Sequence, residues 1–279
     1  MTNRRNFLKA AGIGLAATTL PTLAGAAGPS SVRRKNKFDF KLGIASYSLR
    51  NFNREQALDM TVRCGVERIC FKSMHLPLDS GKAEIEKAVA DCKEKGVALY
   101  SGGVIYMKNN AEVDQAFEYA KMAGMDMIVG VPNHELLSYV EGKVKSYDIK
   151  LAIHNHGPGD DLYPSAESAY NLIKNMDKRM GLCIDIGHTK RIDRNPEQDV
   201  IDFFDRVHDI HIKDVTAAKA EGTTCIVGRG VIDIPSFLET VVKMDYKGTI
   251  ALEYEADAND PLPGMMESFG YTKGVLAML

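Results

Sequence analysis

Leu151-Ala-Ile-His-Asn-His-Gly157 is an apolar run that ends in two histidines and a glycine. Successive side chains of a strand point to opposite faces, so Leu151 and Ile153 would share one face. The opposite face would carry His154 and His156. The run therefore predicts a buried strand with one apolar face and a polar end, which is typical of a functional site at the end of a strand.

Three later stretches follow the same design, with an apolar face opposite a face that ends in a polar side chain. The polar residues are Asp185 in Leu-Cys-Ile-Asp, His211 in Ile-His-Ile-Lys and Glu253 in Ile-Ala-Leu-Glu. Each lies near the C-terminal end of its run, as His154 does. Two imidazoles and two carboxylates suit one divalent ion such as Mn, Co, Zn, Fe or Ni. We therefore predict one divalent metal ion, bound by His154, Asp185, His211 and Glu253.

Each of these residues also has a structural interpretation. A histidine at a strand end can be a hydrogen-bonded structural residue, Asp185 can cap the following loop, and Glu253 can form a buried ion pair with Lys213. Four such residues on consecutive strands together favour the metal site. The sequence leaves open whether His154 or His156 is the ligand from the first of these strands.

Short apolar runs alternate with longer amphipathic ones from residue 41 onward. This alternation predicts parallel strands joined by crossover helices, and eight such units in about 240 residues predict an α/β protein with a single (β/α)8 TIM barrel over residues 38–279. No glycine-rich dinucleotide turn follows the first strand, which disfavours an open doubly wound sheet. The strands are expected at Lys41–Ser46, Glu67–Phe71, Ala98–Gly102, Met127–Val131, Leu151–Asn155, Leu182–Asp185, Asp209–Ile212 and Thr249–Tyr254.

The first 26 residues have the pattern of an export signal. Arg4 and Arg5 precede an apolar small-residue run, and Ala24-Gly-Ala26 offers a cleavage site. The paired arginines are similar to a twin-arginine signal, so the twin-arginine export machinery is an expected partner. Residues 27–37 are expected to be a linker and the mature protein to be periplasmic. Because the apolar run is shorter than the roughly 20 residues of a membrane span, no stable membrane insertion is expected after processing.

Three short motifs carry a resemblance to a known family. In chain order they are Asp185-Ile-Gly-His188, His211-Ile-Lys213-Asp214 and Leu252-Glu253-Tyr254-Glu255. Together they resemble the xylose isomerase-like TIM barrel superfamily, which includes sugar isomerases and epimerases, inosose dehydratases and endonuclease IV relatives. The resemblance covers about residues 38–279. It implies that the aspartate, the histidine of the second motif and the last-strand glutamate bind metal, that His188 contacts substrate or metal, and that Lys213 holds a substrate oxygen.

The chain departs from the family pattern at one position. Many relatives have Glu-Asn-His-Gly after the fifth strand, where the glutamate is both a ligand and an acid/base, whereas this chain has His154-Asn-His-Gly157. An imidazole can bind metal, but the site loses one negative charge. This change puts in doubt the two-carboxylate proton shuttle of the epimerases, so a lyase or dehydratase that acts by β-elimination is a rival to an isomerase.

The predicted chemistry is proton abstraction next to the carbonyl of a non-phosphorylated sugar or keto-sugar. The ion would stabilise the enediolate as a Lewis acid, and Glu253, Glu255 or a free histidine would be the general base. His188 would orient a hydroxyl or return the proton, and Lys213 would hold an oxyanion. The residues predicted to contact substrate are His156, Arg229, Tyr47 and Lys72, with Arg229 alternatively an exposed turn residue.

Two other functions compete with this prediction. A net charge of −2 and only seven histidines disfavour a nucleic-acid partner and the multi-metal site of an endonuclease. A non-catalytic sugar-binding barrel would keep the pocket but bind no metal. The five cysteines form no Cys-x-x-Cys pair, so no disulfide framework is predicted. The particular sugar and the oligomeric state are left open by the sequence.

Overall fold

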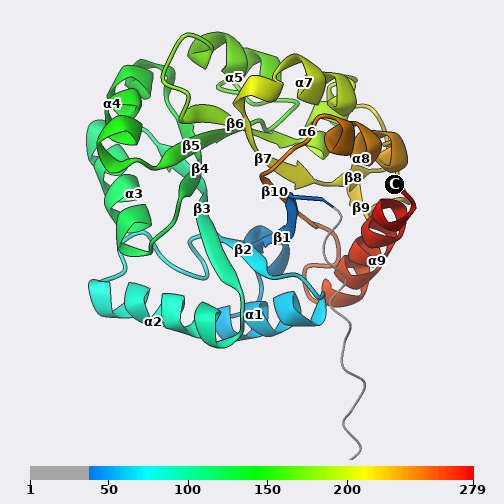
Figure 1. Ribbon diagram of the computed structural model, residues 1–279, viewed down its shortest axis with the longest axis horizontal. Helices are drawn as coiled ribbons and strands as arrows, with labels where there is room; N and C mark the ends of the chain where they lie inside the picture. Colours follow the sequence, from blue (N-terminus) through cyan, green and yellow to red (C-terminus); the bar gives the residue numbers. More distant parts are fainter. Residues whose placement is uncertain (1–37) are drawn as a thin grey trace, which may run out of the picture. The chain divides into compact units, whose positions relative to one another are not determined.

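Eight parallel strands form a closed barrel in the part of the chain that the structure, a computed structural model, describes (Figure 1). The described residues are 38–279, so the predicted export signal and linker lie outside them. The strand order is β1-β10-β7-β6-β5-β4-β3-β2, which confirms the predicted (β/α)8 barrel. The barrel strands are β1 (Lys41–Ala45), β2 (Arg68–Phe71), β3 (Ala98–Met107), β4 (Met127–Pro132), β5 (Lys150–His154), β6 (Met180–Asp185), β7 (Val207–Ile212) and β10 (Thr249–Leu252).

The helices surround the barrel and connect successive strands (Figure 1). None of the helices within residues 38–279 is long and apolar enough to cross a membrane. The α-helices are α1 (Arg54–Arg63), α2 (Lys82–Glu94), α3 (Asn110–Met122), α4 (Leu137–Tyr147), α5 (Ala166–Ile173), α6 (Ile186–Arg191), α7 (Pro196–Asp202), α8 (Ile234–Lys243) and α9 (Leu262–Met278). Short 3-10 turns are η1 (Ser46–Leu49), η2 (His134–Leu136) and η3 (Phe204–Arg206).

Local sequence signals set the ends of the first three helices. At the start of α1, the Asn53 side chain accepts a hydrogen bond from the Gln56 backbone N–H at 2.9 Å, and the Gln56 side chain accepts one from the Asn53 N–H at 3.1 Å. This reciprocal pair satisfies two backbone donors that the helix itself leaves unpaired. Gly65, Gly96 and Gly124 follow α1, α2 and α3 with φ of 65°, 68° and 66°, a left-handed conformation that glycine adopts at low cost.

The alternation along each strand separates two buried layers. Leu151 and Ile153 of β5 pack in the large core between the sheet and the helices. Ala152, between them in sequence, belongs to a second, smaller cluster. That cluster, inside the barrel, consists of Cys70, Tyr100, Met127, Val129, Ala152 and Cys183. It closes the barrel interior beneath the C-terminal ends of the strands, where polar side chains follow.

Three elements near the site were not among the expected ones. The short helix α6 begins directly after β6. The segment Lys219–Asp233 contains β9 (Thr224–Cys225), which pairs antiparallel with β8 (Asp214–Val215). Strands of two residues are too short to show a period of two, so the pattern could not reveal this ribbon. The C-terminal helix α9 contains several glycines, which weaken its helical signal.

Candidate metal centre

Four polar side chains from successive strand ends meet at the mouth of the barrel. His154 and Asp185 are the last residues of β5 and β6, His211 lies in β7, and Glu253 directly follows β10. All four are buried, with exposed fractions between 0% and 6%. One ligand atom from each lies within 4.8 Å of those of the other three. The structure therefore brings together the four residues that the sequence predicted as metal ligands.

The distances within this cluster suit a donor set for one cation. His154 Nε2 lies 3.1 Å from His211 Nδ1 and 3.6 Å from Asp185 Oδ2. Glu253 Oε2 lies 3.5 Å from His211 Nδ1 and 3.9 Å from His154 Nε2. His154 Nδ1 and His211 Nε2 are buried and find no hydrogen-bond partner among residues 38–279. Nitrogen and carboxylate oxygen donors in this arrangement fit a divalent ion of the Zn, Mn or Co type.

The electrostatics of the cluster favour ionised carboxylates and a neutral His154. Burial lowers the pKa of His154, so this imidazole stays neutral and keeps a free lone pair. Burial alone would also lower the pKa of His211, but the charge of Glu253 raises it above its ordinary value. Burial alone would raise the pKa of Asp185 and of Glu253, but the Lys213 ammonium holds both well below their ordinary values. An ion that binds here would therefore compete with the proton whose binding to His211 these carboxylates favour.

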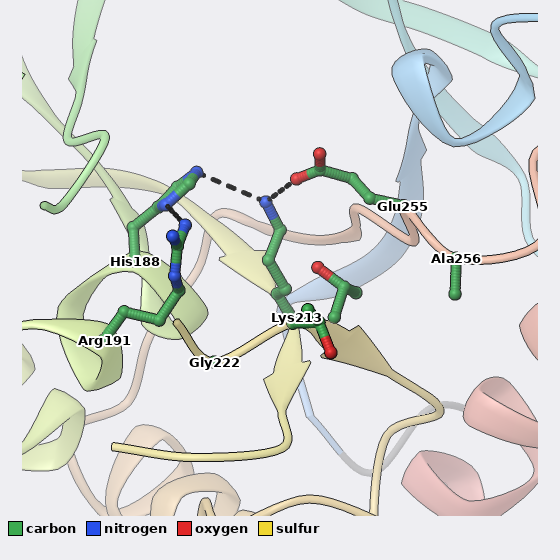
Figure 2. Close-up of a pocket in the computed structure, with 8 residues that line it drawn as sticks. His188, Arg191, Lys213, Gly222, Glu255 and Ala256 are labelled. Carbon is green, nitrogen blue, oxygen red and sulfur yellow. Dashed lines mark hydrogen bonds and ion pairs between the residues drawn. The ribbon is translucent and has the colours of Figure 1, made fainter. Parts of the chain in front are cut away.

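Lys213 balances the negative charge of the site. Its Nζ lies 3.0 Å from Asp185 Oδ2 and 2.9 Å from Glu253 Oε2, and it also forms an ion pair with Glu255 (Figure 2). His188 Nε2 lies 3.4 Å from the same ammonium. Burial alone would lower the pKa of Lys213, but the three carboxylates raise it well above its ordinary value. Glu253 therefore forms the buried ion pair with Lys213 and also belongs to the cluster of candidate metal ligands.

Asp185 uses its two carboxylate oxygens for different purposes. Oδ1 accepts a hydrogen bond from the His188 backbone N–H at 2.8 Å and so caps α6, while Oδ2 faces the cluster. Asn155 fixes the backbone at this point, because its Oδ1 accepts a hydrogen bond from the Asp185 N–H at 2.9 Å. The capping and ligand interpretations of Asp185 are thus compatible, and Asn155 holds the strand end that presents it.

A cavity of about 410 Å³ opens beside the cluster. Three of the predicted catalytic residues line it: His188 from α6, Lys213 after β7 and Glu255 after β10. Figure 2 shows the Lys213 ammonium between His188 and Glu255. The four predicted ligands lie deeper than this lining. The full lining is His188, Arg191, Lys213, Gly222, Thr223, Thr224, Glu255 and Ala256.

His156 lies beside the cluster and does not join its donor set. Its ring centre is 4.5 Å from that of His154, and its Nε2 is 3.1 Å from the Tyr106 hydroxyl. Burial lowers the pKa of His156 to about 4, so it is neutral at pH 7. This placement favours His154 over His156 as the strand-five ligand, and the predicted substrate contact of His156 stays a prediction because this residue does not line the cavity.

The other predicted substrate contacts are not among the residues that line the cavity. Lys72 Nζ donates a hydrogen bond to the Val104 carbonyl at 2.9 Å and lies 5.8 Å from the centre of the Tyr47 ring. Arg229 forms two hydrogen bonds with Glu267 of α9, at 2.6 and 2.8 Å, and does not line the cavity. The structure therefore places Tyr47 and Lys72 together and Arg229 on the outer side of the ribbon segment, where its substrate contact stays a prediction.

Two residues, one hydrogen-bonded to His156 and one lining the cavity, were not predicted from the sequence. Tyr106 belongs to β3, which was expected to end at Gly102 but continues to Met107. Glycine weakens a strand, so the pair Gly102-Gly103 indicated that the strand ends there, whereas β3 continues through it. Arg191 lines the cavity from α6, a helix of six residues that is too short to show helical periodicity.

Comparison with known proteins identifies the family. Residues 63–274, more than half of the 279-residue chain, match the family model described as a xylose isomerase-like TIM barrel. The chain belongs to this family, as its motifs suggested. Proteins similar to this chain include sugar epimerases and inosose dehydratases.

Three similar proteins illustrate the relationship. The rhizopine catabolism protein MocC of Rhizobium meliloti is 26% identical over 144 residues, which cover 46% of this chain and 44% of MocC. An inosose dehydratase of Salmonella agona (strain SL483) is 30% identical over 134 residues, which cover 42% of this chain and 44% of the dehydratase. The chain thus matches less than half the length of these curated relatives. The structure of a D-tagatose 3-epimerase-like protein superposes with a TM-score of 0.71 at 18% identity, covering 86% of this chain and 98% of that one.

Proposed function

We propose that the protein is a divalent-metal-dependent enzyme that isomerises or epimerises a non-phosphorylated sugar or keto-sugar. The observation that carries this proposal is the buried set of His154, Asp185, His211 and Glu253 beside a cavity lined by Lys213. Such a combination of metal donors and a fixed ammonium suits the stabilisation of negative charge on sugar oxygens. The sugar-processing relatives support the choice of substrate class.

The ion would be held by the two imidazoles and the two carboxylates of this set. When bound, a divalent ion supplies Lewis-acid stabilisation of the negative charge that develops next to a carbonyl. His154 is neutral and the carboxylates of Asp185 and Glu253 are ionised, which are the protonation states that ligation requires. Metal analysis of the purified protein identifies which of Mn, Co, Zn, Fe and Ni it binds.

Among the cavity residues, Glu255 is the better placed general base. Both glutamates pair with Lys213, but the Glu255 side chain is 33% exposed and lines the cavity, whereas the Glu253 side chain is only 7% exposed and does not line it. Glu255 would accept the proton from the carbon next to the carbonyl, within hydrogen-bond reach of a sugar in the cavity. The Lys213 ammonium would then donate to the oxygen that gains negative charge.

His188 is suited to orient a hydroxyl of the substrate. Burial lowers its pKa to about 3, so the imidazole is neutral at pH 7. A neutral imidazole can accept a hydrogen bond at one nitrogen and donate one from the other. Its backbone N–H is fixed by the Asp185 carboxylate at 2.8 Å, which ties its position to that of a predicted ligand.

A dehydratase is the second candidate function, favoured by the histidine at position 154. β-Elimination requires one base at the carbon and one acid at the departing hydroxyl, so it does not need two carboxylates on opposite sides of the substrate. Glu255 would take the proton from the carbon and then pass it to the departing hydroxyl, while the Lys213 ammonium, whose raised pKa keeps its proton in place, would hold the oxygen that gains negative charge. The partial similarity to an inosose dehydratase supports this candidate.

The first experiment measures the metal content of the untagged mature protein and of an Asp185→Asn variant. We expect about one divalent ion per chain in the wild type, lost in the variant. Asp233→Asn is the matched control, because Asp233 caps α8 through Ser236 just as Asp185 caps α6 through His188, but lies outside the cluster. Because asparagine and aspartate cap a helix about equally well, this variant should keep its stability and retain the ion.

Incubation with keto-sugars in deuterated water then separates the two chemistries. Deuterium at the carbon next to the carbonyl, in a product of unchanged composition, supports isomerisation or epimerisation. A product that has lost one water supports the dehydratase. Two or three ions per chain would favour an endonuclease, and no ion even after reconstitution would leave a sugar-binding barrel as the better interpretation.

A further inference from the structure

Cys183 lies directly beneath the proposed metal centre. It belongs to β6, two residues before Asp185 and on the same face, and its Cα is in register with that of His154 in β5. The residue is fully buried and forms no disulfide. Its Sγ, one nitrogen of His154 and one nitrogen of His211 all lie within 4.8 Å of one another. Both imidazoles of the proposed centre therefore belong to a second group of possible ligands, in which the third member is a thiol.

A second observation points to a ligand at this place. His154 Nδ1 and His211 Nε2 are buried polar atoms for which residues 38–279 supply no hydrogen-bond partner. Both histidines are only 1% exposed, so bulk water does not satisfy these atoms. Buried polar atoms in native proteins are nearly always paired, and those that are not often mark an ion or an ordered water. Each of the two imidazoles thus keeps one ring nitrogen without a protein partner, and both imidazoles lie close to the Cys183 thiol.

We infer that Cys183 is a further ligand of the metal centre, and that His154, Cys183 and His211 form a face that selects a thiophilic divalent ion such as Zn²⁺ or Co²⁺. The inference rests on the proposed metal centre and extends it from carboxylate and imidazole donors to sulfur. Thiolate and imidazole donors prefer Zn²⁺ and Co²⁺, whereas Mg²⁺ and Mn²⁺ prefer oxygen. Cys183 would therefore decide which ion the protein retains.

To bind one ion, the ligand atoms of His154, Cys183 and His211 must move slightly closer together. Ligand atoms around tetrahedral zinc lie about 3–4 Å apart, given Zn–S and Zn–N bond lengths of about 2.3 and 2.1 Å. A spacing of up to 4.8 Å is therefore within reach of small side-chain rotations. Without an ion, burial raises the pKa of the Cys183 thiol well above its ordinary value. Ligation would convert the thiol to a thiolate and release one proton to solvent.

Cys70 provides a matched control for Cys183. Both cysteines are fully buried members of the small cluster inside the barrel. Cys70, however, donates a hydrogen bond to the Gly103 carbonyl and belongs to no group of possible metal ligands within the described part of the chain. The same Cys→Ser change at the two positions therefore separates loss of a ligand from loss of a buried thiol.

The test is a titration of the untagged, reduced mature protein with Co²⁺ in the absence of oxygen, followed by absorption spectroscopy. A thiolate ligand gives cobalt an intense near-ultraviolet charge-transfer band that imidazole and carboxylate ligands do not give. We expect this band at about one equivalent in the wild type and in Cys70→Ser. Cys183→Ser and Cys183→Ala should lose the band while still binding cobalt through the other ligands.

The outcomes distinguish this inference from the proposed function. Cobalt bound by the wild type without a thiolate band overturns the inference and leaves the metal centre intact. A band that persists in Cys183→Ser assigns it to another cysteine and also overturns the inference. No bound cobalt at all overturns both. Where circular dichroism shows that Cys183→Ser has not folded, Cys183→Ala carries the assignment, and a wild type that binds cobalt without the band overturns the inference whatever the variants do.

Discussion

At the scale of single residues, Lys213 dominates the charge of the site. Its ammonium is 1% exposed and forms ion pairs with Asp185, Glu253 and Glu255. Buried ions are costly to desolvate, so each of these carboxylates depends on a nearby positive charge. A divalent ion would supply positive charge to two of the same carboxylates. The lysine and the ion therefore stabilise the folded protein in overlapping ways.

Replacement of the lysine tests this overlap. Lys213→Met should lower the free energy of unfolding by about 3–5 kcal/mol in the presence of a chelator, because buried carboxylates lose their partner. Addition of the retained divalent ion should recover a large part of that loss. The measurement is urea unfolding with and without the ion, followed by circular dichroism.

The control for this prediction is an exposed lysine on a helix. Lys243 pairs with Glu239 one turn away on α8, and both side chains are largely in solvent. Lys243→Met should change the unfolding free energy by about 0.5 kcal/mol or less and show no ion-dependent recovery. Equal stability of Lys213→Met and wild type with chelator present would show that the carboxylates do not need the ammonium.

The side-chain directions in the site could be predicted because they depend only on the alternation of strands. His154, Asp185, His211 and Glu253 lie inward as their strand positions require. Alternation does not specify contacts between strands that are far apart in sequence. The hydrogen bond between Tyr106 and His156 depends on the unexpected extension of β3, so no local pattern contained it.

At the scale of elements, the turn after β5 sets the position of α6. Gly157 has φ of 75°, and a Cβ there would lie 2.8 Å from the His188 carbonyl oxygen and 3.2 Å from the His188 Cα. Gly159, in the same turn, has φ of 83° but no atom within 4 Å of such a Cβ. Only Gly157 therefore combines a left-handed backbone with close contact to the site.

The two glycines form a matched pair of substitutions. Gly159→Ala should cost about 1–2 kcal/mol, the strain of a left-handed alanine. Gly157→Ala adds crowding against His188, so we expect a total of about 2–5 kcal/mol. Because the His188 N–H is bonded to Asp185, only Gly157→Ala should also weaken ion binding. Thermal unfolding and a metal titration measure the two effects, and equal behaviour of the variants would contradict this account of the turn.

The elements that the sequence did not predict are those without periodicity. The long helices α1 to α3, by contrast, have amphipathic stripes and are followed by glycines with positive φ. The ribbon of β8 and β9 forms because Asp214 and Cys225 become neighbours in the folded chain. Asp214 then accepts hydrogen bonds from the backbone N–H groups of Gly228 and Gly230, which hold the rest of the segment. Contacts of this kind are tertiary and leave no mark in a local pattern.

At the scale of the whole molecule, closure of the barrel is what creates the site. β5, β6, β7 and β10 are neighbours in the closed sheet, so their C-terminal ends form one arc. Regular repetition of strand and helix makes this closure predictable, whereas the identity of the substrate depends on loops of irregular sequence. A barrel whose centre binds its ion only after folding would benefit from an export route that accepts folded proteins.

We propose that Arg4 and Arg5 direct the folded protein to the twin-arginine machinery and that it acts in the periplasm. Changing both to lysine should leave the precursor uncleaved in the cytoplasm, as judged by fractionation and immunoblotting of a bacterium that has this machinery. The chain offers a matched control in Arg33 and Arg34, a second arginine pair within the linker. The same double change there should leave export and processing intact, because it lies beyond the expected cleavage site. Normal processing of the Arg4/Arg5 variant would contradict the assignment, and equal retention of both variants would point to general loss of folding instead.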